Sequence, residues 1–223
     1  MGASRARTAP RRPVPILVLE TAPLGYRLSK RTLDVVVSGT ALLLLSPLLL
    51  LITVATFVSD PRAPVLFRQE RTGLGGRRFQ VLKFRTMVRN ADELKEQLRD
   101  QSVVPWPDFR LPDDPRVTRL GRFLRKTSLD ELPQLVNVLR GDMSLVGPRP
   151  TSFRAETYEL WQTGRLDFRP GITGPWQVMG RDSMDFEERA RLEIGFFRKP
   201  SLLREIKLLF ATVPAVFRRT GVA

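Results

Sequence analysis

The hydrophobic pattern of the chain is dominated by one uncharged run, residues 35–58, with Ser46-Pro47 at its midpoint. At ~1.5 Å per residue, a straight helix of this length would cross a ~30 Å hydrocarbon core. Pro47 removes a backbone donor and clashes with the preceding turn, so the helix should kink or reverse there. Basic residues flank the run on both sides, so the positive-inside rule favours neither orientation. We expect residues 28–59 to form a re-entrant helical hairpin, with a tilted span or a buried soluble helix as alternatives.

Weaker patterns after this run predict one mixed domain over residues 60–223. Two extended segments flank the glycines of GLGGRR and predict a β-hairpin, although the same glycines could cradle phosphate. Helical patterns cover residues 90–100, 118–126, about 130–140, 152–163, 184–198 and 201–219. The helices over 118–126 and 201–219 are amphipathic and suit a membrane surface, although core packing would explain the second equally well. The expected fold is mainly α with a short β-hairpin, in the α+β class, with one compact catalytic or binding domain.

Composition restricts the chemistry of this domain. The 223 residues carry a formal net charge of +14 and contain neither cysteine nor histidine, which excludes disulfides, thiolate nucleophiles and imidazole bases. Carboxylates, Lys and Arg, hydroxyls or a hard metal ion must do the work. The positive charge suits anionic lipid, nucleotide phosphates or nucleic acid alike. Residues 1–27 form a basic, Pro/Arg-rich tail without periodicity, and we expect this tail to be disordered or to lie along a membrane.

The strongest candidates for chemistry are Asp130 and Glu131, within TSLDELPQL. One interpretation is structural, because Ser128 and Glu131 have the spacing of a helix-capping box. Pro133 suits a later helix start, near Asp130. A helix N-terminus also holds a carboxylate ionised as a nucleophile, and adjacent acids point ~100° apart, so that one can attack while the other reaches a metal. From spacing alone, both interpretations stay open.

Several charged residues could complete a site for a diphosphate. The candidates for substrate binding are Lys83, Arg85, Arg125, Asp142, Arg149 and Arg169. Arg149 and Arg169 are set in Pro/Gly turns that fix the backbone direction and suit bidentate contact with phosphate. Each of the others could also be an ordinary surface charge or turn residue.

Several motifs, taken in order, resemble the bacterial monotopic phosphoglycosyl transferases, also called polyprenyl-phosphate sugar-1-phosphate transferases. They are Lys30-Arg31 with Asp34, the apolar run with Ser46-Pro47, KFRTM, SLDELPQLVNVLRGDMSLVGPRP and RPGITG. The resemblance runs from about residue 28 to the C-terminus. It implies a hairpin broken at Ser46-Pro47 and a catalytic domain on the cytoplasmic face of the bacterial inner membrane.

The resemblance also implies an activity. Asp130 would be the nucleophile, Glu131 would hold or orient Mg²⁺ (or Mn²⁺), and a sugar-1-phosphate would pass from a UDP-sugar to a polyprenyl phosphate with release of UMP. The partners expected are these two substrates and membrane lipid, with no nucleic acid, while self-association stays open. The alternative hypothesis is a membrane-anchored basic module that binds nucleic acid or anionic lipid without catalysis. Such a module would need no Asp-Glu pair, and its binding would fall steeply with salt.

Overall fold

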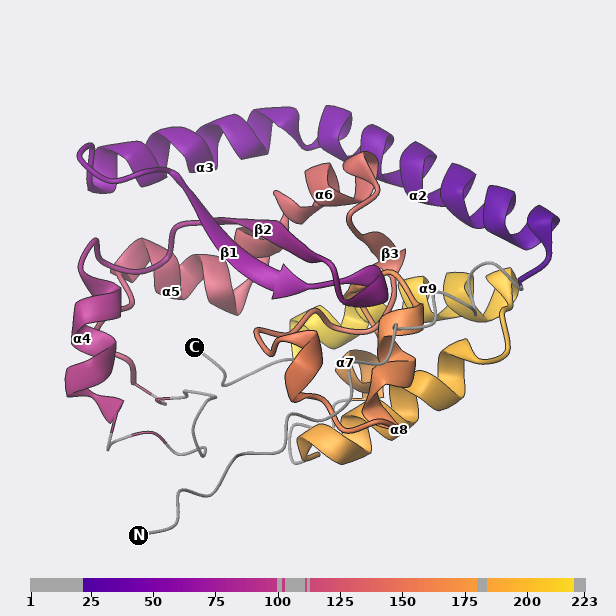
Figure 1. The fold of residues 1–223 in the computed structure, drawn as a ribbon. Helices are drawn as coiled ribbons and strands as arrows, with labels where there is room; N and C mark the ends of the chain where they lie inside the picture. Colours follow the sequence, from indigo (N-terminus) through magenta and orange to yellow (C-terminus); the bar gives the residue numbers. More distant parts are fainter. Residues whose placement is uncertain (1–21, 100–101, 103–110, 112, 180–183, 219–223) are drawn as a thin grey trace, which may run out of the picture.

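A computed structural model describes residues 22–99, 102, 111, 113–179 and 184–218. Most of the basic tail expected over residues 1–27 lies outside these ranges. The first two helices, α2 (Leu24–Leu44) and α3 (Ser46–Ser59), form an arch along one side of the molecule (Figure 1). They meet at an angle of 63° around Leu45, as the position of Pro47 predicts. Pro47 lies in the first turn of α3, where its missing N–H breaks no helical hydrogen bond.

Neither helix of the arch is long and apolar enough to cross a membrane by itself. As a bent pair, α2 and α3 reach the length and hydrophobicity of a span. Their outer surface exposes large apolar side chains to an unusual degree, including Leu43, Leu44, Leu50, Leu51 and Val58. An apolar surface of this kind marks a contact with a membrane or with another protein.

Three polar side chains of α2, those of Lys30, Arg31 and Asp34, connect this helix to the rest of the domain. Arg31 donates two hydrogen bonds of 2.7 Å to the last carbonyls of α6 (Gln134–Arg140). The buried Asp34 carboxylate accepts bonds of 3.0 Å from the hydroxyl of Ser144 and the backbone N–H of Leu145, both in strand β3 (Ser144–Val146). Lys30 pairs with Glu205 of the last helix, α9 (Leu202–Arg218). Three separate elements therefore hold the arch in place.

The β-hairpin predicted from the sequence is present. Strands β1 (Leu66–Thr72) and β2 (Arg78–Phe84) pair antiparallel, and the turn contains the 3₁₀ segment η1 (Leu74–Gly76). Gly75 and Gly76 have φ values of 62° and 78°, so the turn requires glycine for its conformation. A second, two-stranded sheet joins β3 in parallel to β4 (Gly171–Thr173). Strands of three residues are too short to show a sequence period, and this sheet was not predicted.

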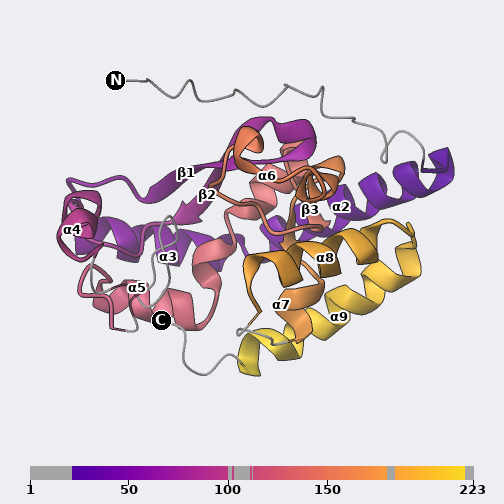
Figure 2. The same ribbon diagram turned by 60° about the horizontal axis from the view of Figure 1, so that its bottom comes forward.

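Short helices surround the hairpin. Figures 1 and 2 show α4 (Ala91–Gln97) and α5 (Arg119–Lys126) at one end of the molecule, and α7 (Pro175–Met179), α8 (Phe186–Phe197) and α9 at the other. The main core lies between α6, β2, β3, α8 and α9, and a smaller cluster joins Ile52 of α3 to Phe84 and Leu124. The α+β class is confirmed.

One helix expected from the sequence is wrong. Residues 152–163 contain the 3₁₀ segment η4 (Ala155–Thr157) and the start of a second, η5 (Gln162–Asp167), but no α-helix. The hydroxyls of Thr157 and Thr163 donate to carbonyls three residues earlier. Such local bonds compete with the α-helical pattern and favour tight turns.

Candidate functional site

Asp130 and Glu131 lie in a tight turn and do not cap a helix. They belong to the 3₁₀ segment η3 (Leu129–Glu131), and α6 begins only at Gln134, after Pro133. The side chain of Ser128 makes no capping hydrogen bond, so the capping-box interpretation is wrong. Ser128 adopts a left-handed conformation with φ 56°, the only positive φ of a non-glycine among the described residues. Such backbone strain is found most often at functional sites.

Glu131 is held by two basic side chains. Nζ of Lys83 lies 2.8 Å from its Oε1 atom, and Nη2 of Arg149 lies 3.2 Å from the same oxygen. Burial opposes ionisation of Glu131, but Lys83 and Arg149 outweigh it and hold the pKa of the carboxyl well below its usual range. Glu131 is therefore a fixed negative charge at physiological pH.

The pKa of Asp130 shifts in the opposite direction, because its side chain is buried and lies beside the negative charge of Glu131. Burial, and then the neighbouring Glu131, raise the pKa of Asp130 to about 6, against the attraction of Lys83 and Arg125. A helix N-terminus would favour ionisation of Asp130, as expected from the sequence, but the residue lies in a 3₁₀ turn and is only 8 % exposed. At pH 7, roughly one unit above this pKa, the ionised form of Asp130 still outnumbers the protonated form by about tenfold.

Arg125 completes the basic surroundings of Asp130. Helix α5 is capped at its N-terminus by Thr118, whose hydroxyl accepts a hydrogen bond from the N–H of Gly121. A Cβ atom on Gly121 would lie 2.0 Å from the carbonyl oxygen of Thr86, so only glycine allows this approach. The close packing brings Nε of Arg125 to 3.0 Å from the Thr86 hydroxyl. Burial lowers the pKa of Arg125, and the Asp130 carboxylate partly offsets this effect.

A buried side chain of α6, that of Asn137, positions the strand that carries Lys83. Asn137 is fully buried, and its amide accepts a bond from the N–H of Leu82 and donates one to the carbonyl of Gln80. These two bonds fix β2 against α6 immediately beside Lys83. The turn that carries Glu131 and the strand that carries Lys83 are thus tied to the same helix.

Three other predicted residues lie elsewhere. Arg85 donates to the carbonyls of Thr56, Asp60 and Pro64, so its contacts hold the end of α3. Arg169 lies near α2, where burial and then the charge of Arg31 lower its pKa. Asp142 accepts a long bond of 3.5 Å from Asn137 at the end of α6. The structure brings Asp130 and Glu131 together with Lys83, Arg125 and Arg149, and places Arg85, Arg169 and Asp142 outside this group.

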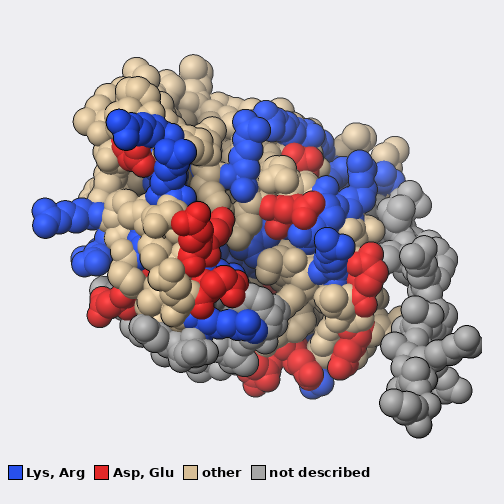
Figure 3. All heavy atoms as spheres, turned by 60° about the vertical axis from the view of Figure 1, so that its left-hand side comes forward, with Lys and Arg blue, Asp and Glu red and all other residues tan. Residues whose placement is uncertain are grey.

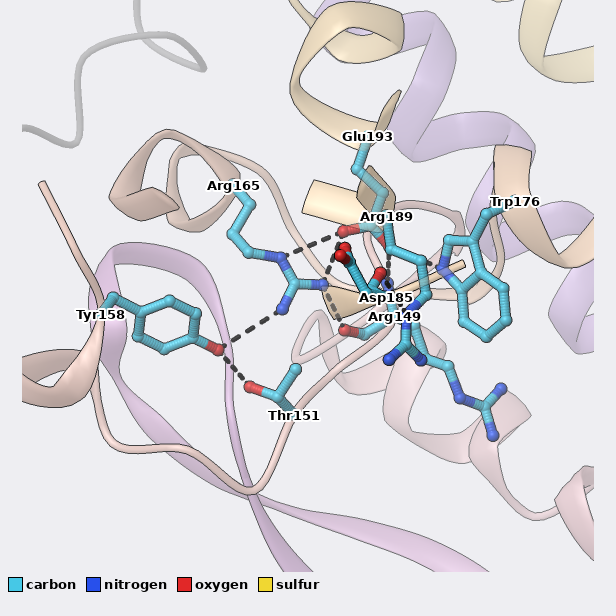
Figure 4. Close-up of polar contacts among 8 residues, drawn as sticks. All are labelled: Arg149, Thr151, Tyr158, Arg165, Trp176, Asp185, Arg189 and Glu193. Carbon is cyan, nitrogen blue, oxygen red and sulfur yellow. Dashed lines mark hydrogen bonds and ion pairs between the residues drawn. The ribbon is translucent and has the colours of Figure 1, made fainter. Parts of the chain in front are cut away.

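A buried ion pair behind Arg149, between Arg165 and Glu193, was not expected from the sequence. Figure 4 shows the Arg165 guanidinium reaching the carboxylate of Glu193, with the indole of Trp176 on the other side. One signal was present in the sequence, because Glu193 falls on the apolar stripe of α8 formed by Ala190, Ile194 and Phe197. A glutamate at such a position must find a buried partner.

Two cavities lie close to Glu131. One is polar, with arginines and aromatic rings in its wall: Arg71, Arg149, Phe153, Arg165, Trp176, Phe186 and Arg189. The other is mainly apolar and contains Glu131 together with Leu132, Leu135, Ile172 and Thr212. Arg149 borders the first cavity and contacts Glu131, which borders the second, so this contact links the walls of the two cavities. On the face shown in Figure 3, basic and acidic side chains are interspersed.

The carboxylates suit a hard metal ion only in part. Among the described residues, no group of three or more potential ligands is present. Mg²⁺ is commonly held by one or two carboxylates together with substrate phosphates, however. Both donors of Glu131 use Oε1, so within the described ranges Oε2 has no hydrogen-bond partner. Glu131 could therefore offer Oε2 to a cation that a phosphorylated substrate also binds.

A buried carboxylate next to a permanently ionised one, with three basic groups around them, defines a site suited to phosphoryl transfer. Comparison with known proteins agrees with this class of chemistry. Residues 25–219 match the family model described as bacterial sugar transferase, and the chain belongs to that family of transferases.

Relatives with assigned names cover most of the chain. The undecaprenyl-phosphate galactose phosphotransferase of Salmonella typhimurium is 44% identical over 205 residues, which make up 90% of this chain and 43% of the relative. The UDP-glucose:undecaprenyl-phosphate glucose-1-phosphate transferase of Caulobacter vibrioides is 42% identical over 85% of this chain and 70% of its own. The exopolysaccharide production protein ExoY of Rhizobium meliloti is 41% identical over 89% of both. The chain thus spans less than half the length of some relatives and most of others.

Proposed function

We propose that this protein transfers a sugar-1-phosphate from a UDP-sugar to a polyprenyl phosphate, as the first step of a lipid-linked glycan. The single observation that carries the proposal is the environment of Asp130, a buried carboxylate beside Glu131 and within reach of the charges of Lys83 and Arg125. The names of the relatives support the two substrates, since they include UDP-glucose and undecaprenyl phosphate.

The reaction follows from the chemistry of a carboxylate nucleophile. An oxygen of Asp130 attacks the β-phosphorus of the UDP-sugar, the bond from this phosphorus to the oxygen bridging the two phosphates breaks, and UMP leaves with the electron pair. A phosphate oxygen of the polyprenyl phosphate then attacks the phosphorus of the aspartyl-phosphosugar. The carboxylate of Asp130 leaves, and the product is a polyprenyl diphosphate sugar.

The basic groups stabilise the charge that develops on phosphorus-bound oxygens. Hydrogen bonds within the folded chain hold Lys83 of β2, Arg125 of α5 and Arg149 of the segment after β3, so these groups need little reorganisation during the reaction. Mg²⁺, with Mn²⁺ as a possible substitute, would be held by Glu131 and by substrate phosphates, and would supply further positive charge there. A phosphate that approaches Asp130 thus meets a site with a net positive field.

The arch of α2 and α3 supports a location of this chemistry at a membrane. We infer that α2 and α3 form a re-entrant hairpin with both ends on the cytoplasmic face of the bacterial inner membrane, because the pair is bent at Pro47 and exposes leucines along its outer surface. The basic amphipathic helix α5, with Phe123 exposed, suits the same interface. A soluble nucleotide sugar and a lipid phosphate could then reach one site from opposite directions.

The test is the covalent intermediate. The purified protein is incubated with a panel of UDP-sugars, and UMP release is measured with and without polyprenyl phosphate. With β-phosphate-labelled donor and no acceptor, the wild type should retain label, and Asp130→Asn should retain none and turn over at least about 10³-fold more slowly. Near-normal turnover by a folded Asp130→Asn protein would reject Asp130 as the nucleophile.

A further inference from the structure

The ion pair of Arg165 and Glu193 is buried more completely than any other in the described part of the chain. Side-chain exposure is 5 % for Arg165 and 0 % for Glu193. Nε and Nη2 of Arg165 both contact Oε2 of Glu193, at 3.0 and 2.6 Å. Buried pairs of this kind add little stability, because desolvation offsets their attraction. Their presence therefore calls for a second explanation.

Two further hydrogen bonds of this pair hold the backbone of one residue, Arg149. Oε1 of Glu193 accepts a bond of 2.9 Å from the backbone N–H of Arg149. Nη2 of Arg165 donates a bond of 2.8 Å to the backbone carbonyl of the same residue. Arg149 stands between Pro148 and Pro150, which have no N–H of their own. Both backbone polar groups of Arg149 are thus held by the one ion pair.

The same ion pair also affects the side chain of Arg149, through Trp176. Oε1 of Glu193 also accepts a bond of 3.0 Å from Nε1 of Trp176, which fixes the indole. The guanidinium of Arg149 lies 6.0 Å from the centre of that ring, at the outer limit for a cation–π contact. From there Nη2 reaches Glu131 at 3.2 Å, while about a third of the side chain stays exposed. The guanidinium can therefore contact a bound ligand as well as Glu131.

We propose that Glu193 and Arg165 are positioning residues, which hold the backbone of Arg149 so that its guanidinium meets the phosphates of the donor beside Glu131. This inference rests on the proposed function for the role of Arg149. The hydrogen bonds that hold the backbone of Arg149 do not depend on that function, because they are present in the folded chain without substrate. The ion pair touches neither Asp130 nor Glu131, and its hydrogen bonds lead to Arg149, Trp176 and Tyr158. Of these three residues, Arg149 is the one that contacts Glu131.

The test replaces the pair by apolar residues of similar size, Glu193→Leu with Arg165→Met. Such replacements are often neutral for stability, so the variant is expected to fold. Arg165→Lys is the second variant, because it keeps the charge but loses donors to Arg149. The matched control is Glu187→Leu with Arg191→Met, which removes an exposed ion pair from the same helix.

The first measurement is amide hydrogen exchange in the peptide that contains Arg149. This amide should exchange at least about tenfold faster in the Glu193/Arg165 variant, while the amides of β3 and the control variant match the wild type. Because exchange needs no substrate, this result stands whether or not the protein is a transferase. Unchanged protection of the Arg149 amide would overturn the proposal.

The second measurement is kcat/KM for UMP release in two backgrounds. With Arg149 present, the loss of the ion pair should lower kcat/KM by about 10²-fold, the effect of losing one oriented donor. In an Arg149→Ala background the same change should have less than a twofold effect, because the residue it positions is already gone. A purely structural pair would reduce activity equally in both backgrounds. Absence of turnover in the wild type would reject the proposed function and leave the exchange result to decide the positioning.

Discussion

Nζ of Lys83 in strand β2 lies 2.8 Å from Oε1 of Glu131 in the η3 turn, 48 residues further along the chain. This contact joins the β-hairpin to the turn that carries both carboxylates. Burial disfavours the ionised form of Asp130 and of Glu131, and the positive charge of Lys83 favours it in both.

Replacing Lys83 should therefore shift the pH dependence of the reaction. In Lys83→Met the pKa of Asp130 rises from its value of about 6, because a nearby positive charge is lost. The acidic limb of the kcat/KM profile should move to higher pH, and the plateau should fall by about 10²-fold. Lys83→Arg keeps the charge and should keep the position of the limb. An unshifted limb in Lys83→Met would show that another group governs it.

The buried carboxylate of Asp130 should reduce stability at neutral pH. Its pKa of about 6 in the folded protein exceeds the ordinary value of 3.8, so ionisation disfavours the folded state increasingly from pH 4 to pH 6, and by a constant amount above. Asp130→Asn should raise the free energy of unfolding at pH 8 by up to about 3 kcal/mol, and the gain should vanish below pH 4. Chemical denaturation at several pH values measures this difference.

Glu131→Gln should change the free energy of unfolding in the opposite direction in the same experiment. Its carboxyl has a lowered pKa, so its ionised form stabilises the folded state above the ordinary pKa of 4.5, and this stabilisation is lost as the pH falls. The variant should be less stable than the wild type at pH 8, with a smaller difference in acid. If both variants changed stability in the same direction, the assignment of the two environments would be wrong.

Removal of divalent cations should stop turnover. EDTA is expected to abolish UMP release, and Mg²⁺ or Mn²⁺ to restore it, since phosphate oxygens and Oε2 of Glu131 are hard ligands. Glu131→Gln should lower turnover by at least about 10²-fold even at high Mg²⁺, while circular dichroism shows an intact fold. Full activity in the presence of chelator would remove the metal from the proposed mechanism.

The two ends of the arch should lie on the same side of the membrane. The chain has no cysteine, so single cysteines at Gly25 and Arg68 can be labelled selectively in intact cells with an impermeant reagent. Gly25 has open space around its Cβ position, and Arg68 is exposed on β1. Both sites should stay protected until the membrane is opened. Labelling of only one site would mean that the bent pair crosses the membrane.

Local rules of the chain determined much of the fold and the centre of the site. Pro47 predicted the break between α2 and α3 because a proline cannot continue a helix without losing a hydrogen bond. Gly141, with φ 88°, ends α6 in the left-handed conformation that glycine adopts most readily at the end of a helix. Asp130 and Glu131 were identified from an acidic pair beside a proline and an apolar helix. These features depend on residues within a few positions of each other.

Tertiary structure alone decided which charges surround the carboxylates. Arg85 lies two residues after Lys83, yet it holds the end of α3, whereas Arg149 arrives at Glu131 from the segment after β3. Burial of Asp130, which raises its pKa to about 6, likewise depends on packing between distant elements. The ion pair behind Arg149 joins residues 28 positions apart. Packing between distant parts of the chain creates these contacts and shifts the pKa values. They cannot be predicted from the local hydrophobic pattern of the sequence.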